Sequence, residues 1–171
     1  HMLASYTLYR SPLLNTLTAF ERLVNTISGE ESTPKPTAET APPQAVALTR
    51  SNSTGASEKP NAYAQLVQRL DLASMDEQHR CSLELSQHLT RAAAYLHASL
   101  RDLDLGFCKG ARNYDLQRIA PLMPNLIHLN LASGGRTDIV ISKIAKHCPR
   151  LVRLSIAWNS AVSDFGCAEI A

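Results

Sequence analysis

Leucines recur at a regular spacing in the second half of the chain, in segments of the form L-x-x-L-x-L. Three such segments begin at Leu100, Leu126 and Leu151, so that their starts are 26 and 25 residues apart. An earlier copy begins at Val67, 33 residues before Leu100. Apolar and polar positions alternate at the end of each segment, which is the pattern of a β-strand with one buried face. The repeat predicts a row of stacked structural units.

A helical pattern follows each of the three later strand segments. Apolar residues come at spacings of three and then one, which places them on one face of a helix. The positions are Leu116, Ile119 and Ala120, then Ile141, Ile144 and Ala145, then Cys167, Ile170 and Ala171. Pro121, Pro124 and Pro149 fall near the predicted helix ends, where proline stops a helix. Each unit is therefore predicted to be a strand, a turn and a helix that returns to the next strand.

The unit that begins at Val67 is longer, and so is its predicted helix. The segment Ser74-Met-Asp-Glu77 has the form of a capping box, in which two side chains satisfy free N–H groups at a helix start. We expect one helix from about Met75 to Ala98. Its apolar face is formed by Cys81, Leu85, Leu89, Ala92 or Ala93, and Leu96.

Composition divides the chain into three zones. Residues 1–29 are predicted to be a helical segment that starts near Ser11-Pro12 and stops at Gly29. Its apolar face is Leu13, Leu17, Phe20, Val24 and Ile27. Residues 30–62 hold five prolines among many Ser and Thr, so they bury too little apolar area to offset chain entropy and are predicted to be a disordered insertion. Residues 63–171 are the repeat domain.

The repeat predicts an α/β solenoid with an exposed polar strand face. One unit buries too little apolar area to fold alone, so neighbouring units must share a core, with parallel strands on one side and helices on the other. The residues between the leucines of each strand then point away from the core onto a concave face. They are Arg69, Asp71, Asp102, Asp104, His128, Asn130, Arg153 and Ser155, and all are polar.

A rigid polar face of this kind predicts a surface that binds a protein, because it loses little entropy on association. Two aromatic residues, Phe107 and Trp158, fall in the turns after two of the strands. An aromatic side chain beside a binding face is either an anchor for the partner or a filler between units. Both interpretations stay open for Trp158, whereas Phe107 is assigned as a filler. The predicted partner-binding residues are the eight strand residues and Trp158.

Charge and hydropathy narrow the class of partner. Lys and Arg total 17 and Asp and Glu total 15, for a net charge of +2. This near balance gives no bulk attraction to nucleic acid or to a membrane surface. The apolar runs are too short to span a bilayer, and no secretory signal opens the chain. We therefore predict a cytoplasmic and/or nuclear protein whose partner is neither nucleic acid nor a membrane.

The residue types that carry metal, redox or catalytic chemistry are present without the usual spacing. The four cysteines are Cys81, Cys108, Cys148 and Cys167. They form no zinc-type C-x-x-C pair and are predicted to be reduced and mostly buried. The six histidines form no H-E-x-x-H motif, so no metal and no cofactor is expected. Asp102 and Asp104 could act as general acid and base, which leaves a hydrolase as a remote alternative to a protein without enzymatic activity.

Three sequence elements carry a family resemblance. Leu100 to Cys108 matches L-x-x-L-x-L-x-x-C, Val162-Ser-Asp-Phe-Gly166 matches I-T-D-x-G, and Ile144-Ala-Lys-His-Cys148-Pro149 matches I-A-x-x-C-P. With these elements the C-terminal part of the chain resembles the cysteine-containing subfamily of leucine-rich repeats. Gly134 and Asn159 stand where the pattern has Cys, which predicts variable turns. The resemblance implies a leucine-rich-repeat solenoid, a right-handed α/β superhelix with parallel strands on its concave side and helices outside, of which this chain is a fragment.

This subfamily is similar to the repeat domain of F-box proteins, the substrate receptors of SCF ubiquitin ligases. The segment His1-Met-Leu-Ala-Ser-Tyr-Thr-Leu8-Tyr9-Arg10 resembles the tail of an F-box. The resemblance implies a non-catalytic subunit that binds its target on the concave face. It also implies that the SCF adaptor and cullin bind through an F-box upstream of residue 1 in the full-length protein. The alternative is a leucine-rich-repeat scaffold outside the ubiquitin system, in signalling or DNA repair.

Overall fold

The computed structural model describes residues 14–29 and 62–170, and within them the fold is mixed α/β with one parallel sheet. The sheet has four short strands, and their order in space is their order in the chain. The strands are β1 (Arg69–Asp71), β2 (Asp102–Asp104), β3 (His128–Asn130) and β4 (Arg153–Ser155). All four coincide with the strand segments that the leucine pattern predicts, including the early copy that begins at Val67.

The strands pair in exact repeat register. Leu70, Leu103, Leu129 and Leu154 lie beside one another across the sheet, and the polar residues on either side of them are paired in the same way. The backbone pairing continues past the strand ends, because the N–H of Leu105 donates to Asn130 O at 2.8 Å and equivalent bonds join the neighbouring strands. Equal residues of successive units therefore form straight rows across the sheet.

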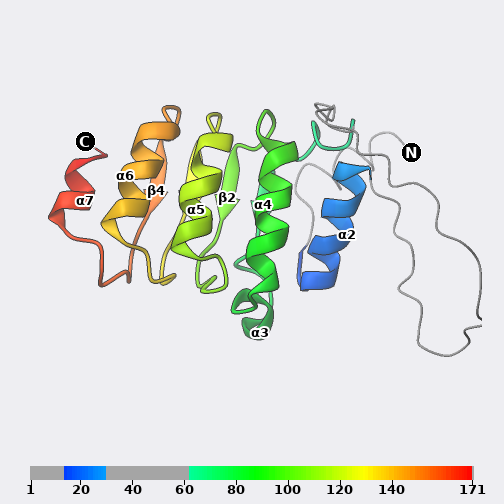
Figure 1. Ribbon diagram of the computed structural model, residues 1–171, viewed down its shortest axis with the longest axis horizontal. Helices are drawn as coiled ribbons and strands as arrows, with labels where there is room; N and C mark the ends of the chain where they lie inside the picture. The colour runs from blue at the N-terminus through cyan, green and yellow to red at the C-terminus, as the bar shows by residue number, and fades with distance from the viewer. Residues whose placement is uncertain (1–13, 30–61, 171) are drawn as a thin grey trace, which may run out of the picture.

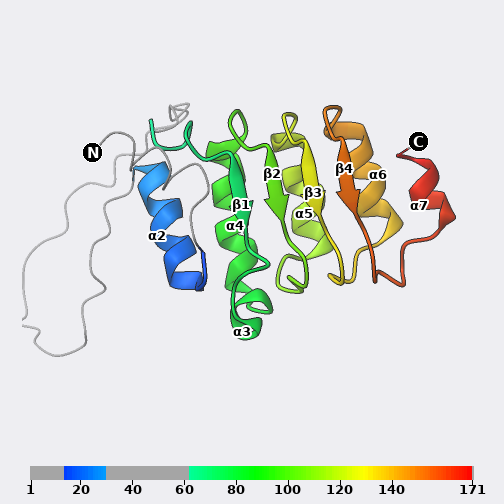
Figure 2. The same ribbon diagram turned by 180° about the vertical axis from the view of Figure 1, so that it is seen from behind.

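All helices but one lie side by side, again in chain order, as Figure 1 shows from the helix side; the exception is the short helix Glu77–Arg80, which lies at the end of the helix that follows it. The helices are α2 (Leu17–Ser28), α3 (Glu77–Arg80), α4 (Glu84–Leu96), α5 (Asn113–Ile119), α6 (Asp138–His147) and α7 (Asp164–Ala168), and a 3-10 helix, η1 (Ala120–Leu122), follows α5. The view from behind has the strands in front (Figure 2). In the described part of the chain, no helix covers that side of the sheet.

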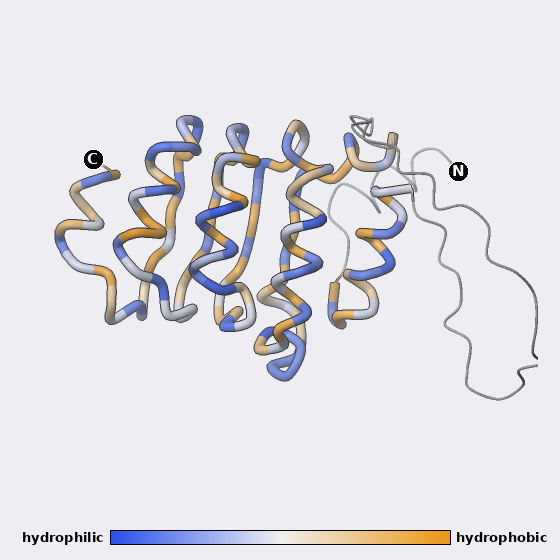
Figure 3. The backbone as a smooth tube through the Cα atoms, viewed as in Figure 1, coloured by the Kyte–Doolittle hydropathy of each residue, from blue (hydrophilic) through white to orange (hydrophobic). Residues whose placement is uncertain are grey.

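The core lies between the strands and the helices. In the first three strands both apolar residues of the L-x-L pattern, such as Leu103 with Leu105 and Leu129 with Leu131, are buried against apolar residues of the helices. Hydrophobic and hydrophilic positions alternate along the backbone of both layers (Figure 3). Leu154 in β4 is only half-buried, because β4 has a neighbouring strand on one side only within the described residues.

Helix α2 confirms the helix expected in the N-terminal segment. The Thr16 hydroxyl accepts a hydrogen bond from the Ala19 N–H at 3.1 Å, and Gly29 ends the helix in the left-handed conformation with φ of 76°. The predicted apolar positions at 17, 20, 24 and 27 are buried, and the helix packs against α4. Leu13, Ser11-Pro12 and the insertion predicted at 30–62, except its last residue, lie outside the described residues.

The single helix predicted from Met75 to Ala98 is wrong, because the chain breaks into α3 and α4 at residues 81–83. The Ser82 hydroxyl accepts a hydrogen bond from the Glu84 N–H at 3.2 Å, a local bond that competes with a continuous helix. The Gly110 N–H also donates to Arg80 O at 2.8 Å. A Cβ at position 110 would lie 2.2 Å from Ser82 O, so this close contact with the turn after β2 requires glycine.

The capping box predicted at Ser74–Glu77 is also wrong. Asp76 is the N-cap residue of α3, and it makes no side-chain capping bond. Ser74 instead belongs to the turn after β1, where its N–H donates to Asp71 Oδ1 at 3.2 Å and its hydroxyl donates to Asp71 O at 3.4 Å. The short polar side chains here stabilise a turn and not a helix start.

The turns after β2, β3 and β4 share one unusual backbone conformation. Phe107, Ser133 and Trp158 occupy the same position in successive units, and their φ angles are 61°, 54° and 60°. They are the non-glycine residues of the described chain with positive φ. The N–H of Phe107 donates to Ala132 O and that of Ser133 to Ala157 O, both at 2.8 Å. The ladder between units therefore holds this left-handed position in place.

Two sequence-based assignments in these units need correction. Cys108 and Cys148 are buried as predicted, but Cys81 and Cys167 are exposed, and all four are free thiols. Cys81 ends α3 at the break described above, which turns it away from the core. Phe107 is 54% exposed and so does not fill a gap between units.

Candidate functional site

The uncovered side of the sheet carries two straight rows of polar side chains. We call this surface the open face and define it by the eight polar residues of the four strands. The first row is Arg69, Asp102, His128 and Arg153, and the second row is Asp71, Asp104, Asn130 and Ser155. The structure thus brings together the eight strand residues that the sequence predicts as partner-binding. None of them is buried.

The middle of the open face is hollowed. The hollow has a volume of about 370 Å³, and its floor is formed by the leucines at the centres of β2, β3 and β4. Seven of the eight open-face residues surround it, and Asp71 lies outside it. The pattern predicts the leucines as core residues, and the structure shows that their strand-side atoms also line this surface.

Asp102 and His128 are register partners on neighbouring strands and border the hollow. The His128 Nδ1 and the Asp102 Oδ1 are in direct contact, as a hydrogen bond that becomes an ion pair when the ring is protonated. This contact leaves the other ring nitrogen, Nε2, to hold or accept a proton from a bound molecule. General-base chemistry would require a substrate atom within hydrogen-bond reach of that nitrogen.

Asp104 and Asn130 form the second pair of the open face. The Asn130 Nδ2 donates to Asp104 Oδ1 at 2.9 Å. Each side chain also accepts from its own turn: the Gly106 N–H donates to Asp104 Oδ1 at 2.9 Å, and the Ala132 N–H donates to Asn130 Oδ1 at 3.0 Å. Asp104 and Asn130 therefore accept the same turn hydrogen bond in successive units, and they differ in charge. The two carboxylates considered as an acid–base pair, Asp102 and Asp104, each bind a different neighbour.

Arg69 and Arg153 stand at the two ends of the first row. Both are exposed. Within residues 14–29 and 62–170, neither guanidinium has a hydrogen-bond or ion-pair partner. Three strand spacings of about 4.8 Å separate them, so the row is roughly 14 Å long. Both cations are therefore available to a partner.

Trp158 lies in the turn beyond β4 and does not line the hollow. Its side chain is 86% exposed, so it fills no gap between described units. Phe107 occupies the equivalent turn after β2, with the Arg80 guanidinium carbon 5.7 Å from its ring centre. The two aromatic rings are therefore exposed apolar groups at the same turn position of two units.

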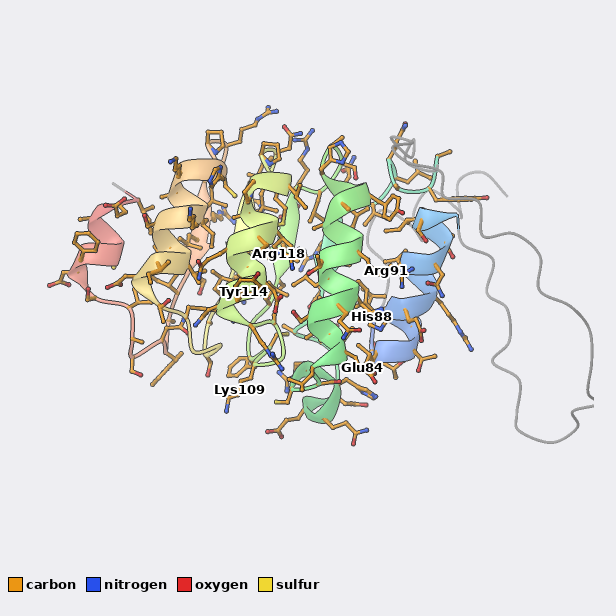
Figure 4. The ribbon with its side chains drawn as sticks, viewed as in Figure 1. Glu84, His88, Arg91, Lys109, Tyr114 and Arg118 are labelled. Atoms are coloured by element: carbon orange, nitrogen blue, oxygen red, sulfur yellow. The ribbon has the colours of Figure 1, made fainter. Side chains whose placement is uncertain are left out.

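The helical side of the molecule has polar contacts of its own (Figure 4). On α5, the Arg118 guanidinium carbon lies 5.7 Å from the Tyr114 ring centre. On α4, the His88 ring meets Phe20 of α2 edge-on at 6.1 Å between ring centres. Burial lowers the pKa of His88; the charges of Glu21 and Glu84 oppose this effect, and that of Arg91 adds to it. None of these side chains lines the hollow of the open face.

Sequence reasoning missed two features of the site. The first is the Asp102–His128 contact, although the shared offset of both residues within their units places them in one row. The second is the buried polar support beneath the turns, where Arg136 is 1% exposed and Asn159 is 7% exposed. The only signal for Asn159 is its position where the repeat pattern has Cys, and Arg136 carries no signal in its own segment.

Groups of metal-ligating side chains and membrane-spanning helices were sought in the described residues. No group of three or more His, Cys, Asp or Glu side chains in the described residues is arranged to hold a metal ion. No helix of the described ranges combines the length and the apolar character needed to cross a bilayer.

No family model matches the chain. No solved structure matches it.

Proposed function

We propose that this chain is a leucine-rich-repeat solenoid that binds a protein partner on its open face and has no catalytic role. The observation that carries the proposal is the alignment of eight polar side chains in two rows on a face that no described helix covers. A pre-formed rigid surface loses little entropy when a partner binds. The two unpaired guanidinium groups and the exposed Trp158 ring supply contact groups of the types that dominate protein interfaces.

We further propose that this protein is the substrate-recognition subunit of an SCF-type E3 ubiquitin ligase. The support is the resemblance of the repeat elements to the cysteine-containing subfamily and of residues 1–10 to the tail of an F-box. On this proposal the target occupies the open face, and the SCF adaptor and cullin bind elsewhere on the full-length protein.

The open face is tested by affinity purification of the tagged full-length protein from its own cells. A triple variant, R69A/R153A/W158A, removes two exposed cations and one exposed apolar group from the strand side. A matched control, K143A/K146A/I139A, removes the same kinds of group from exposed positions on α6. Apart from the SCF adaptor and cullin, we expect the proteins that copurify with the wild type and the control to be lost from the open-face variant. Equal recovery with both variants would refute the proposed site.

The ligase role is tested in the same purification. We expect the SCF adaptor and a cullin to be recovered with the wild type and with the open-face variant, because they bind at a different place. Their absence from the wild-type sample would refute the ligase assignment. It would leave a leucine-rich-repeat scaffold outside the ubiquitin system, in signalling or DNA repair, as the remaining candidate.

A further inference from the structure

The open face carries opposite charge on its two halves. The half formed by β1 and β2 has three carboxylates, Asp71, Asp102 and Asp104, against the single guanidinium of Arg69. The half formed by β3 and β4 has the guanidinium of Arg153 and no carboxylate. A partner that crosses the strands therefore meets an acidic surface first and a basic surface next, or the reverse.

The carboxylates of the second row lie close together. Asp71 and Asp104 are register partners on neighbouring strands, and strands in a sheet lie about 4.8 Å apart. Like charges directly opposite each other on a sheet are unfavourable. Each uses one oxygen for its own turn, Asp71 for the Ser74 N–H and Asp104 for the Gly106 N–H. A cation placed between these two carboxylates would relieve their repulsion and would meet no competing guanidinium within the second row.

The charges of the first row are not equally available. Asp102 is in contact with His128, which offsets its charge when the ring is protonated. Arg153 has no hydrogen-bond or ion-pair partner among the described residues. Its neighbours on the open face are His128 and Ser155, and neither is an anion. An acidic group of a partner would therefore be drawn to the β4 end.

We infer that the open face binds an extended protein segment that places a Lys or Arg over Asp71 and Asp104 and an acidic side chain at Arg153. This inference rests on the proposed protein-binding function and specifies the charge pattern of the bound segment. The midpoint of the carboxylate pair and Arg153 are two and a half strand spacings apart across the sheet, about 12 Å, and one row apart along the strands, about 7 Å, so they are separated by about 14 Å. An extended chain advances about 3.3 Å per residue, and residues four apart point to the same side. The two opposite charges therefore stand about four residues apart in the segment.

Segments of a single charge fit this surface less well. A uniformly acidic or phosphorylated segment gains Arg153 and Arg69 but meets the carboxylate pair. A uniformly basic segment gains the carboxylates but meets Arg153. The hollow between the two charged ends is bordered by Asn130 and lined by leucine side chains, so a small uncharged side chain midway between the two charges is accommodated there.

The test is selection of random linear peptides, displayed on phage, by the purified full chain. Two variants separate the charges. D71N/D104N removes both carboxylates and keeps the acceptor oxygens, as Asn130 does at the equivalent position of β3. R153Q removes the cation. The matched controls are E77Q and K143Q, which remove an exposed charge of each sign outside the open face. Thermal melts of all variants check that they remain folded.

We expect the wild type and both controls to enrich peptides with one basic and one acidic residue about four positions apart, in either order. D71N/D104N is expected to lose the preference for the basic residue and R153Q the preference for the acidic one. Affinity for a selected peptide is expected to fall about two- to fivefold in each variant.

The inference is overturned if the selected peptides share no charge pair, carry one sign of charge only, or keep their preference in both variants. It is also overturned if the folded chain enriches no peptide at all. Failure of the proposed function has a different signature, namely equal recovery of cellular partners by the open-face and helix-face variants described above. A chain that passes that purification and fails the peptide selection binds proteins by a pattern other than the one inferred.

Discussion

The guanidinium of Arg136 fills the space that a side chain at position 134 would occupy. A Cβ atom on Gly134 would lie 2.5 Å from Arg136 Nη2 and 2.6 Å from Nε. The buried guanidinium donates from Nη2 to Cys108 O at 2.9 Å and from Nη1 to Ala111 O. Burial lowers the pKa of Arg136 to about 10, and the group remains charged at neutral pH. The glycine that departs from the repeat pattern is thus explained by an arginine two residues later.

Each turn satisfies the carbonyls of the preceding unit with a different polar group. After β2 it is the Cys108 thiol, which donates to Leu72 O at 3.4 Å. After β3 it is Arg136, and after β4 it is the Asn159 amide, which donates to Leu131 O at 2.9 Å. Asn159 Oδ1 also accepts from the N–H groups of Gly134 and Arg136, at 3.2 and 2.8 Å. The three turns are therefore linked in series beneath the strand ends.

The first prediction tests the exchange between Gly134 and Arg136. Gly134→Cys alone is expected to destabilise the fold by about 1–3 kcal/mol, because it overpacks the site. Arg136→Ala alone leaves Ala111 O without a hydrogen-bond partner, at a cost of about 1–3 kcal/mol, and leaves Cys108 O only the Ala111 N–H at 3.3 Å. Alanine occupies the equivalent position, 161, in the next unit. In the double variant the new thiol has room and carbonyl acceptors nearby, so its loss should be smaller than the sum of the single losses.

This double-mutant cycle is measured by urea denaturation of the wild type and the three variants. Losses that simply add would show that the two positions do not share one space, contrary to the contacts described above.

The second prediction concerns Asn159. Asn159→Ala removes the donors to three carbonyls and the acceptor for two N–H groups, so we expect a loss of about 2–4 kcal/mol from unpaired buried groups. Asn159→Cys restores the repeat pattern and one donor, and it should recover part of this loss. Chemical denaturation compares the two variants. A cysteine variant no more stable than the alanine variant would contradict the donor role.

The third prediction follows from Asp138, whose carboxylate accepts from the Ser163 hydroxyl at 2.7 Å and from the Ser163 N–H at 2.8 Å. These hydrogen bonds lower the pKa of Asp138 in the folded chain. The folded state therefore holds this proton more weakly than the unfolded state. The resulting stability is present above the unfolded pKa and is lost as pH falls through the folded pKa.

Asp138→Asn is accordingly expected to lower Tm at neutral pH, with a difference from wild type that shrinks on acidification. Thermal melts across the acid range measure this difference. Asp164→Asn is the control, because the Asp164 side chain has no hydrogen-bond partner in the described residues. A gap between Asp138→Asn and wild type that stays constant with pH would contradict the assignment.

The fourth prediction separates the four thiols by reactivity. Burial raises the pKa of Cys108 to about 12 and that of Cys148 to about 11, so both are protonated and shielded at neutral pH. Cys81 and Cys167 are exposed. Brief treatment of the native chain with iodoacetamide should alkylate Cys81 and Cys167 first, and treatment in denaturant should alkylate all four. Peptide mass spectrometry identifies the alkylated cysteines. Early labelling of Cys108 would contradict its burial.

The fifth prediction sets stability against binding at Trp158. The left-handed conformation costs a non-glycine residue roughly 1–2 kcal/mol. Trp158→Gly relieves this strain, against an entropic cost of about 0.5–1 kcal/mol for glycine. Tm should therefore stay level or rise, while recovery of partner proteins falls. Trp158→Ala, which keeps the strain, should lose binding without the gain in Tm. A glycine variant that retains all partners would refute the anchor role.

Much of the architecture could be predicted because it depends on local periodicity repeated several times. The spacing of Leu70, Leu103, Leu129 and Leu154 predicts four strands, and the structure places these residues side by side. The same periodicity predicts which residues lie on the exposed face of the strands, so the eight strand residues of the candidate site can be predicted from the sequence. Whether they bind a partner stays a prediction.

The errors arise where a distant segment decides the local structure. The helix pattern from Met75 to Ala98 is real, since its apolar face is buried from Leu85 onward, but contact with the turn at Gly110 and the Ser82 hydroxyl breaks it near the start. The Ser82 bond is local, but no pattern within residues 75–98 shows the contact with Gly110. Likewise, a charged residue such as Arg136 is expected at the surface from sequence alone. Its burial depends on carbonyl groups in the preceding unit.

The amino-acid sequence alone determines the strand positions, their common register and the polar character of the open face, because alternation and repeat length act through the backbone geometry of each unit. Only the tertiary structure decides the break between α3 and α4, the pairing of Asp102 with His128 and the filling of the Gly134 space by Arg136. These features depend on hydrogen bonds and close contacts between segments that are 25 or more residues apart, such as those from Arg136 and His128. Such contacts become specified only when neighbouring units are packed against each other.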